Sequence, residues 1–416
     1  MERILLEPRI LKCVIREKDF VAYETNNQDG LKVYVTSTPY TRDVINKPQE
    51  MMGIPFKHAL RDGFSKAIDY LPETQFLGDI GLEDETRINV YSLLRGGLNA
   101  QITEALFQSK FRIQRAHHTV LAISSTRSTS GRVHAEHFDY DKYTIRDQSC
   151  IFMWDIVATG TSARCAMAKM TEDVMGLDRK DLPKWITEDL SSIPNNKGAK
   201  KREIKNIFFG SIGGDKLEDV LIPYHRLYQQ EFQSYRGITI TYMELIAGLA
   251  SETNQGRIFK KENGRDYYWP GTDLLLGIDA TRTPEFELSL YGSEDGRRFI
   301  APCIIWDGGA RGFSPHDFGK EMRERWIIHR NLAKEGINLW DIIIERNPWL
   351  ERELTLNENE FMDYKRLIWQ DVPEELINEI YKKQRRLFTK GKIKDMETPR
   401  SLEKLANELI GEINAV

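Results

Sequence analysis

The chain has 416 residues, of which 40% are hydrophobic and 29% are charged, so it encodes a sizeable core and is not a disordered protein. Its formal net charge of −4 at pH 7 gives no overall positive field for nucleic acid, which leaves only local basic patches for such contacts. The first residues lack a signal-peptide core and no apolar run is long enough to span a bilayer, so we expect no membrane partner and a cytoplasmic location.

The cysteines support the same location. There are four of them, Cys13, Cys150, Cys165 and Cys303. They lack the paired spacing of a disulfide framework or a zinc site, and they fit a reducing compartment.

The first part of the chain alternates between short strands and helices. Strand-like runs within residues 1–50 predict a strand-rich N-terminal extension. A helix is predicted over 52–75, an apolar strand over 88–95 and a second helix over 98–108. Residues 112–150 mix polar loops with short strands.

The alternation continues through the middle of the chain. A strand and a helix are predicted within 151–175, and further buried strands at 207–211 and 274–279. The segment 164–205 reads as an insertion that holds an extra helix and the basic linker 194–202. Strands that alternate with helices predict an α/β fold with a mostly parallel sheet flanked by helices.

The chain changes character near residue 314. From there it becomes charged and helical, and no further strand–loop–helix signature appears. We therefore interpret 51–313 as the α/β core and 314–416 as a helical C-terminal appendage. The appendage is a candidate surface for a protein partner or for self-association.

The most informative segment is 151–163, which reads IFMWDIVATGTSA. Four mostly apolar residues suit a buried strand, Asp155 stands at its end, and a small-residue turn leads into a helix. Backbone N–H groups at a helix N-terminus favour a phosphate, whereas the Asp155 carboxylate suits sugar hydroxyls or a bridging Mg²⁺. The candidate phosphate-binding residues are Ala158, Thr159, Gly160, Thr161 and Ser162. The structural alternative is a helix that is capped by Thr159 or Thr161.

This order of strand, acid and small loop resembles the phosphoribosyl-diphosphate motif of type I phosphoribosyltransferases, and is closest to uracil-type members. Many members carry two adjacent acids, and here Trp154 occupies the first acidic position. The resemblance covers roughly residues 50–313. It implies the phosphoribosyltransferase fold, Mg²⁺ as cofactor, and phosphoribosyl diphosphate or a nucleotide together with a nucleobase as ligands.

A second segment, 91–100, reads YSLLRGGLNA. Glycines allow the backbone to approach an anion, and a guanidinium binds phosphate oxygens bidentately. The segment is similar to the diphosphate-binding loop of the same family, so Arg95, Gly96 and Gly97 are the candidate diphosphate-binding residues. The alternative is a glycine turn with a solvated arginine.

Two arginines lie in the Ser/Thr/Gly-rich stretch between these motifs. In the family, a loop in this interval closes over the diphosphate, where basic groups stabilise the charge of the leaving group. Arg127 and Arg132 are the candidates for this role, and the alternative is an ordinary surface loop. The nearby histidines His134 and His137 lack the spacing of a helical zinc pair, so we expect no metal there.

The last candidate segment is 299–313, which loosely resembles the base-binding segment of uracil phosphoribosyltransferases. There Trp306 offers an apolar surface for stacking, and Asp307 offers a hydrogen-bonding carboxylate. The alternative is a strand that is followed by a glycine turn.

The resemblance implies an enzyme that transfers phosphoribosyl to or from a nucleobase, with diphosphate as the leaving group. Asp155, Arg127 and Arg132 would be its catalytic residues, and Asp155 would also contribute indirectly to the metal site. Two alternatives stay open. One is a nucleotide-sensing or regulatory protein that has lost turnover, and the other is a defence-system effector with the same fold.

Overall fold

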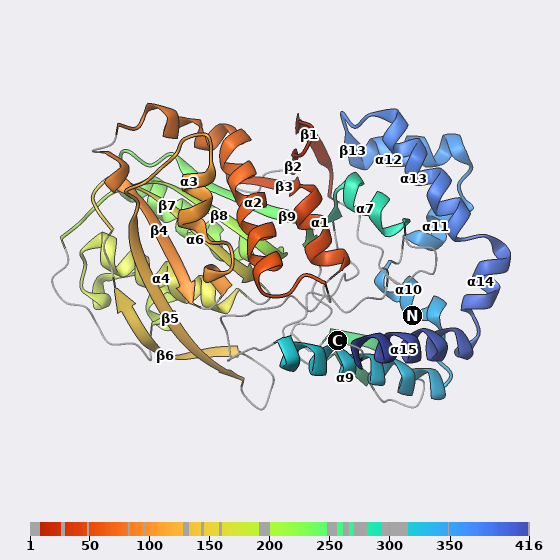
Figure 1. The fold of residues 1–416 in the computed structure, drawn as a ribbon. Coiled ribbons are helices and arrows are strands. Elements are labelled where there is room, and N and C mark those ends of the chain that lie inside the picture. Colours follow the sequence, from red (N-terminus) through yellow and green to blue (C-terminus); the bar gives the residue numbers. More distant parts are fainter. Residues whose placement is uncertain are drawn as a thin grey trace.

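The structure is a computed structural model of the chain. It describes residues 9–25, 30–47, 50–81, 84–94, 96–127, 133–142, 145–157, 160–190, 200–247, 256–260, 266–269, 281–292, 299, 315–347 and 349–414. Within these ranges it confirms an α/β fold with a mostly parallel sheet, helices on both of its faces and a helical C-terminal region (Figure 1).

The main sheet has the strand order β13-β1-β2-β3-β9-β8-β7-β4-β5-β6, and β12 pairs with β9 at the side. Strands β3, β9, β8, β7, β4 and β5 are parallel to one another, whereas β2 and β6 run antiparallel to their neighbours. The bounds are β1 Leu11–Arg16, β2 Val21–Thr25, β3 Lys32–Ser37, β4 Ile88–Leu94, β5 His117–Arg127, β6 Val133–Lys142, β7 Ser149–Val157, β8 Ile204–Gly214, β9 Gly237–Ala247, β12 Thr281–Arg282 and β13 Trp369–Gln370. A separate hairpin consists of β10 Gly256–Lys260 and β11 Asp266–Trp269.

The central strands are apolar almost throughout. In β7 every residue except Ile156 is buried, and β9 is buried from Ile238 to its end. Parallel strands that are covered on both faces have this continuous pattern, because neither face meets water. The predicted strand at 207–211 lies within β8, and the one at 274–279 falls outside the described residues.

Helices cover both faces of the sheet (Figure 1). One face carries α1 (Pro39–Asn46), α2 (Ile54–Tyr70) and α3 (Ile102–Gln108), and the other carries α4 (Thr161–Met175) and α6 (Lys216–Glu231). The assignment follows from contacts: a Cβ on Gly210 of β8 would lie 2.5 Å from the Phe64 ring of α2. On the opposite face, the Tyr91 hydroxyl of β4 donates to the Ala166 carbonyl of α4 over 3.2 Å.

The described connections are short. They include four segments of 3₁₀-helix, which are η1 (Pro72–Asp79), η2 (Asp84–Arg87), η3 (Gly96–Leu98) and η4 (Arg179–Asp181). The helix that we expected over 98–108 begins only at Ile102, because η3 occupies the start of that range. The extra helix that was expected within 164–205 is α5 (Lys184–Asp189).

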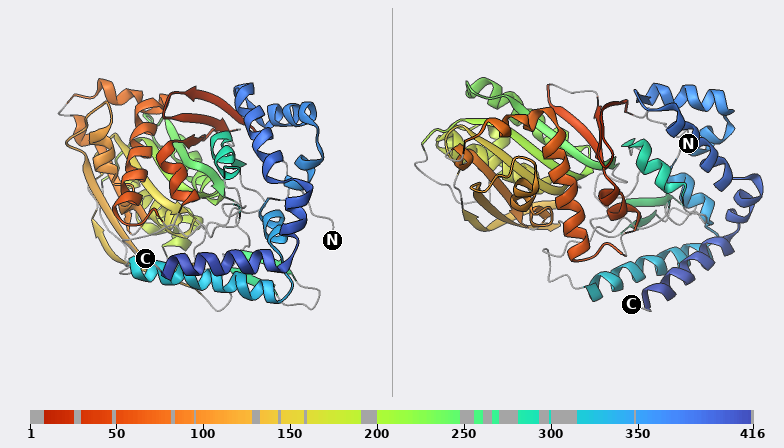
Figure 2. Two further views of the ribbon diagram at one scale, coloured as in Figure 1. Left: turned by 45° about the vertical axis from the view of Figure 1, so that its right-hand side comes forward. Right: turned by 45° about the horizontal axis from the view of Figure 1, so that its top comes forward.

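Residues 315–414 are almost entirely helical, and α9 and α15 lie side by side at one border of the molecule (Figures 1 and 2). The helices are α9 Pro315–Lys334, α10 Leu339–Arg346, α11 Leu350–Thr355, α12 Glu358–Ile368, α13 Glu374–Leu387, α14 Lys390–Met396 and α15 Pro399–Asn414. Strand β13 interrupts them and pairs in parallel with β1, so the main sheet extends into this region. The sequence pattern did not reveal this two-residue strand.

A buried polar cluster joins these helices to α7 (Pro284–Leu290). Lys365 of α12 is 1% exposed, and its Nζ lies 2.7 Å from a Glu287 oxygen and 2.8 Å from a Glu353 oxygen. Gln384 of α13 donates to Glu353 over 2.7 Å and to the Tyr291 hydroxyl over 2.9 Å. The helical region is therefore docked through a buried ion pair as well as through apolar contacts.

Two further observations concern the apolar character of the helices and the cysteines. Of the helices that the structure describes, none combines the length and the apolar character needed to cross a membrane. Cys13, Cys150 and Cys165 are free thiols, and Cys303 falls outside the described residues.

Candidate functional site

The sheet has a topological switch point between β4 and β7. From β4 the chain continues through α3 to β5 on one side, and from β7 it continues through α4 to β8 on the other. The carboxyl ends of both strands therefore meet where the connections diverge. In open α/β sheets this crevice is where ligands bind.

Asp155 lies at this crevice on the face that carries α4. Successive side chains of β7 alternate between the two faces. Met153 is paired with Tyr91, whose hydroxyl contacts α4, and Asp155 is two residues further along the same face. Its side chain is largely buried, at 8% exposed, and one carboxylate oxygen accepts a 2.9 Å hydrogen bond from the Ile156 N–H.

Trp154 points to the opposite face. It is completely buried. Its ring and the Phe64 ring of α2 lie on the same side of Gly210 in β8, because a Cβ added to this glycine would be 2.5 Å from Trp154 Cδ1 and 2.5 Å from the Phe64 ring. Among the described residues, its indole N–H has no hydrogen-bond partner. The position that holds the first acid in the resembling family is therefore part of the core under α2, and Asp155 is the carboxylate that remains at the crevice.

The helix α4 begins after a glycine. Gly160, which has no side chain to act as a cap, occupies the N-cap position with φ 74°, and the first turn contains no acidic residue. A Cβ on Gly160 would lie 2.8 Å from a Val220 methyl group, so this position requires glycine both for its conformation and for space. The alternative in which Thr161 caps the helix is wrong, because Thr161 is already its first residue.

The rest of the predicted phosphate loop is described only in part. Thr161 is 9% exposed and Ser162 is half-buried, whereas Ala158 and Thr159 lie outside the described residues. The positive end of a helix dipole favours an anion near the first turn of a helix.

The glycine turn after β4 packs against the end of β7. A Cβ on Gly97 would lie 3.0 Å from the Trp154 carbonyl oxygen, so the backbone of this turn approaches β7 closely, and a larger residue would require a small local shift. The structure thus brings Gly97 of η3 next to the part of β7 that carries Asp155. The strand does not end at Asp155, as we expected from the sequence, but continues to Val157. Gly96 opens the same turn, and Arg95 lies outside the described residues.

The hairpin of β5 and β6 projects beyond the carboxyl edge of the sheet. The last residue of β5 that pairs with β4 is Ala122, and the strand continues to Arg127, where it pairs with Val133 of β6. These additional residues extend about 16 Å past β4 at the usual rise of a strand. The backbone of Arg127 is thus at the tip of the hairpin, and Arg132 falls outside the described residues.

Two predicted parts of the site remain, which are the base-binding residues and the metal ligands. Trp306 and Asp307 lie outside the described residues. Within the described ranges, no group of three or more His, Cys, Asp or Glu side chains is placed to hold a metal ion. Mg²⁺ commonly binds through one or two carboxylates and the phosphates of a substrate, so a single Asp155 fits such a shared site and not an all-protein metal cage.

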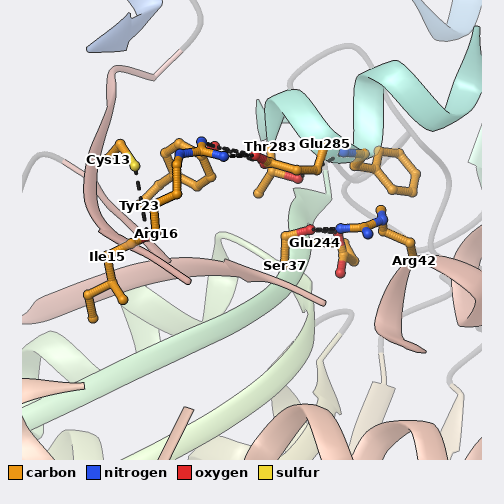
Figure 3. A network of polar contacts seen from close by, with 10 residues as sticks. Cys13, Ile15, Arg16, Tyr23, Ser37, Arg42, Glu244, Thr283 and Glu285 are labelled. Atoms are coloured by element: carbon orange, nitrogen blue, oxygen red, sulfur yellow. Dashed lines mark hydrogen bonds and ion pairs between the residues drawn. The ribbon is translucent and has the colours of Figure 1, made fainter. Parts of the chain in front are cut away.

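Sequence reasoning missed a second polar cluster at the carboxyl ends of β3 and β9 (Figure 3). Glu244 of β9 is completely buried, with φ 70°, and accepts hydrogen bonds from the Ser37 hydroxyl over 2.7 Å and the Thr38 N–H over 2.9 Å. The Thr41 hydroxyl donates to the same carboxylate, and Arg42 donates to Ser37 over 2.8 Å. A single acid within the apolar run ITITYMELIA was the available signal. Because several donors satisfy this carboxylate, it anchors the start of α1 to β9.

This anchor predicts a pH-dependent stability. Burial raises the pKa of Glu244 from 4.5 to about 7. The folded carboxyl group binds its proton more tightly than the unfolded one, so stability falls as the pH rises between these values. We expect this group to remove on the order of 3 kcal/mol from the free energy of unfolding across that range. Urea unfolding at pH 5 and pH 8 should show a steeper decline for the wild type than for Glu244→Gln. Equal declines would contradict the assignment.

No protein-family model matches this chain, and no curated protein is significantly similar to it. The case for the site therefore rests on its sequence motifs and on the geometry around the β4–β7 switch point.

Proposed function

We propose that the protein binds phosphoribosyl diphosphate, or a nucleotide, at the β4–β7 switch point and transfers phosphoribosyl to or from a nucleobase. The observation that carries the proposal is the meeting of three features at this edge. Asp155 lies near the carboxyl end of β7, the turn at Gly160 opens α4, and Gly97 places the β4 turn against β7. Their order along the chain is the order of the resembling motifs.

Each feature fits one part of the ligand. The first turn of α4 and the hydroxyls of Thr161 and Ser162 suit the 5-phosphate. Asp155 suits the ribose hydroxyls, because a carboxylate accepts hydrogen bonds from them and repels phosphate. The turn at Gly96 and Gly97 suits the diphosphate. The resemblance assigns Arg95, Arg127 and Arg132 to the same group, and Ala158 and Thr159 to the 5-phosphate loop.

The reaction needs no covalent nucleophile. Its transition state resembles an oxocarbenium ion, and positioning and charge stabilisation supply most of the rate enhancement. Asp155 holds the sugar. As in the loop that the segment resembles, Arg127 and Arg132 are the groups proposed to stabilise the charge of the leaving group. Mg²⁺, when bound with the diphosphate, neutralises part of its charge. Trp306 and Asp307 are the residues proposed to contact the base.

One observation favours a second candidate function. Because Trp154 belongs to the core under α2, a single carboxylate serves the sugar and the metal at this edge. A site of this kind suits a protein that senses or consumes nucleotides in a regulatory or defence role, with little or no phosphoribosyl transfer.

The test is titration calorimetry with phosphoribosyl diphosphate and Mg²⁺, together with an assay of diphosphate release in the presence of pooled nucleobases. Asp155→Asn keeps the shape of the side chain, and we expect it to weaken binding by about 10- to 100-fold, the value of a hydrogen bond to a charged group. The matched control is Asp79→Asn, an exposed aspartate of η1, which should bind as the wild type does.

The two functions give different results in this experiment. Diphosphate release that is lost in Asp155→Asn supports the transferase. Tight binding without release supports the sensor. If the wild type does not bind, or if Asp155→Asn and Asp79→Asn bind equally, the proposed site is wrong.

A further inference from the structure

A strongly basic segment spans the end of α13, the short connection after it and most of α14. Residues 382–394 read KKQRRLFTKGKIK and contain seven lysines and arginines without a single aspartate or glutamate. The chain as a whole has a net charge of −4, so this segment has the opposite sign from the protein that carries it. It lies far along the chain from every motif of the switch-point site.

Five of these cations are exposed and form no ion pair within the described part of the chain. We call them the basic junction: Lys382, Arg386, Lys390, Lys392 and Lys394. The other two cations have internal partners. Lys383 pairs with Glu379 over 3.0 Å, and Arg385 donates to the backbone carbonyls of Glu353 and Leu356 over 2.7 and 2.6 Å.

Favourable interactions with the helix dipoles explain only part of the positive charge in the basic junction. Arg386 is in the last turn of α13, where a positive charge complements the helix dipole. Lys390 and Lys392 are in the first turn of α14, which contains no acid, and there a positive charge opposes the dipole. Each such lysine destabilises the start of α14, so their presence favours a role in binding an anionic partner.

The apolar residues of the segment indicate which kind of partner. Leu387 and Phe388 are 3% and 4% exposed, so neither is available to insert into a membrane or to stack on an unpaired base. Tyr381, on the preceding turn, packs on Phe361 with ring centroids 5.3 Å apart. The basic junction therefore presents charge without stacking groups, which suits the regular phosphates of a double-stranded nucleic acid.

We propose that the basic junction binds the phosphate backbone of duplex nucleic acid without sequence preference. Lys382 and Arg386 are four residues apart on α13, and Lys390 and Lys394 are four apart on α14, so each pair is about one helical turn apart on its helix. The binding is independent of the switch-point site.

The experiment measures fluorescence anisotropy of labelled 20-base-pair DNA and RNA duplexes, and of a single strand of equal length, against the full chain. Neutralising about five phosphates gives a slope of log K against log salt near −4 to −5. We expect the triple variant Lys390→Gln, Lys392→Gln, Lys394→Gln to reduce this slope to about −2 and the affinity by about tenfold or more. The duplexes should bind more tightly than the single strand.

The matched control is Lys18→Gln, Lys184→Gln, Lys200→Gln, which removes the same charge from exposed lysines outside the helical C-terminal region. This variant should bind duplex as the wild type does. Absence of duplex binding, or an equal loss in both triple variants, would overturn the proposal. Binding to anionic phospholipid vesicles in place of duplex would also overturn it and would identify a membrane surface as the partner.

Discussion

Replacing Trp154 by aspartate should lower the free energy of unfolding by about 5 kcal/mol, because the change removes a large buried aromatic side chain and buries a carboxyl group without a partner. Truncation of a buried tryptophan alone costs about 3–5 kcal/mol, and an unsatisfied buried polar group adds about 1–3. A domain with ordinary stability of about 5–15 kcal/mol would lose a large part of it. The same substitution would recreate the pair of adjacent acids found in the resembling family.

Thermal and urea unfolding of the variant measure this effect. Trp154→Phe is the control, since it keeps an aromatic ring, and the described structure shows no hydrogen bond to the indole N–H. We expect the phenylalanine variant to cost roughly 1–2 kcal/mol. If the aspartate variant instead folds with wild-type stability and binds Mg²⁺ more tightly, Trp154 does not belong to the core under α2.

The second large effect concerns Lys365. Replacing it by methionine keeps most of the side-chain volume but leaves Glu287 and Glu353, which are 3% and 0% exposed, without their shared cation. Removing one partner from a buried ion pair costs about 3–5 kcal/mol. The change also removes the contact of the ammonium group with the Trp369 ring, 4.3 Å from its centroid.

The size of this loss of stability and its dependence on pH distinguish the contribution of the ion pair from that of side-chain packing. Burial already raises the pKa of Glu353, and without Lys365 this carboxyl group should be protonated at still higher pH. The methionine variant should therefore recover stability as the pH falls towards 5, and adding Glu287→Gln and Glu353→Gln should restore most of it at pH 7. A loss below about 1 kcal/mol for Lys365→Met would show that the ion pair contributes little.

The sequence predicted the elements that local patterns specify. The apolar run before Asp155 lies within β7, the predicted helix after it is α4, and the turn at Gly96 and Gly97 follows β4. These patterns depend on residues close together in the chain, so periodicity and turn chemistry suffice to read them.

Contacts between distant segments were not predictable in the same way. The pairing of β1 with β13, and the meeting of Lys365 with Glu287, join residues that are far apart in sequence and carry no local signature. The direction of Trp154 depends on the register between β7 and its neighbours, which the sequence does not fix by itself. The role of Glu244 follows from the position of α1, which supplies its donors.

The pairing of β1 with β13 has a consequence for synthesis. Leu11 leaves the ribosome long before its neighbour Trp369 has been synthesised. Until then the unpaired backbone of β1 is open to other nascent chains, which is a known route to aggregation. Completion of the sheet is therefore a late event in folding, and a chaperone that shields this border during translation would benefit the protein most.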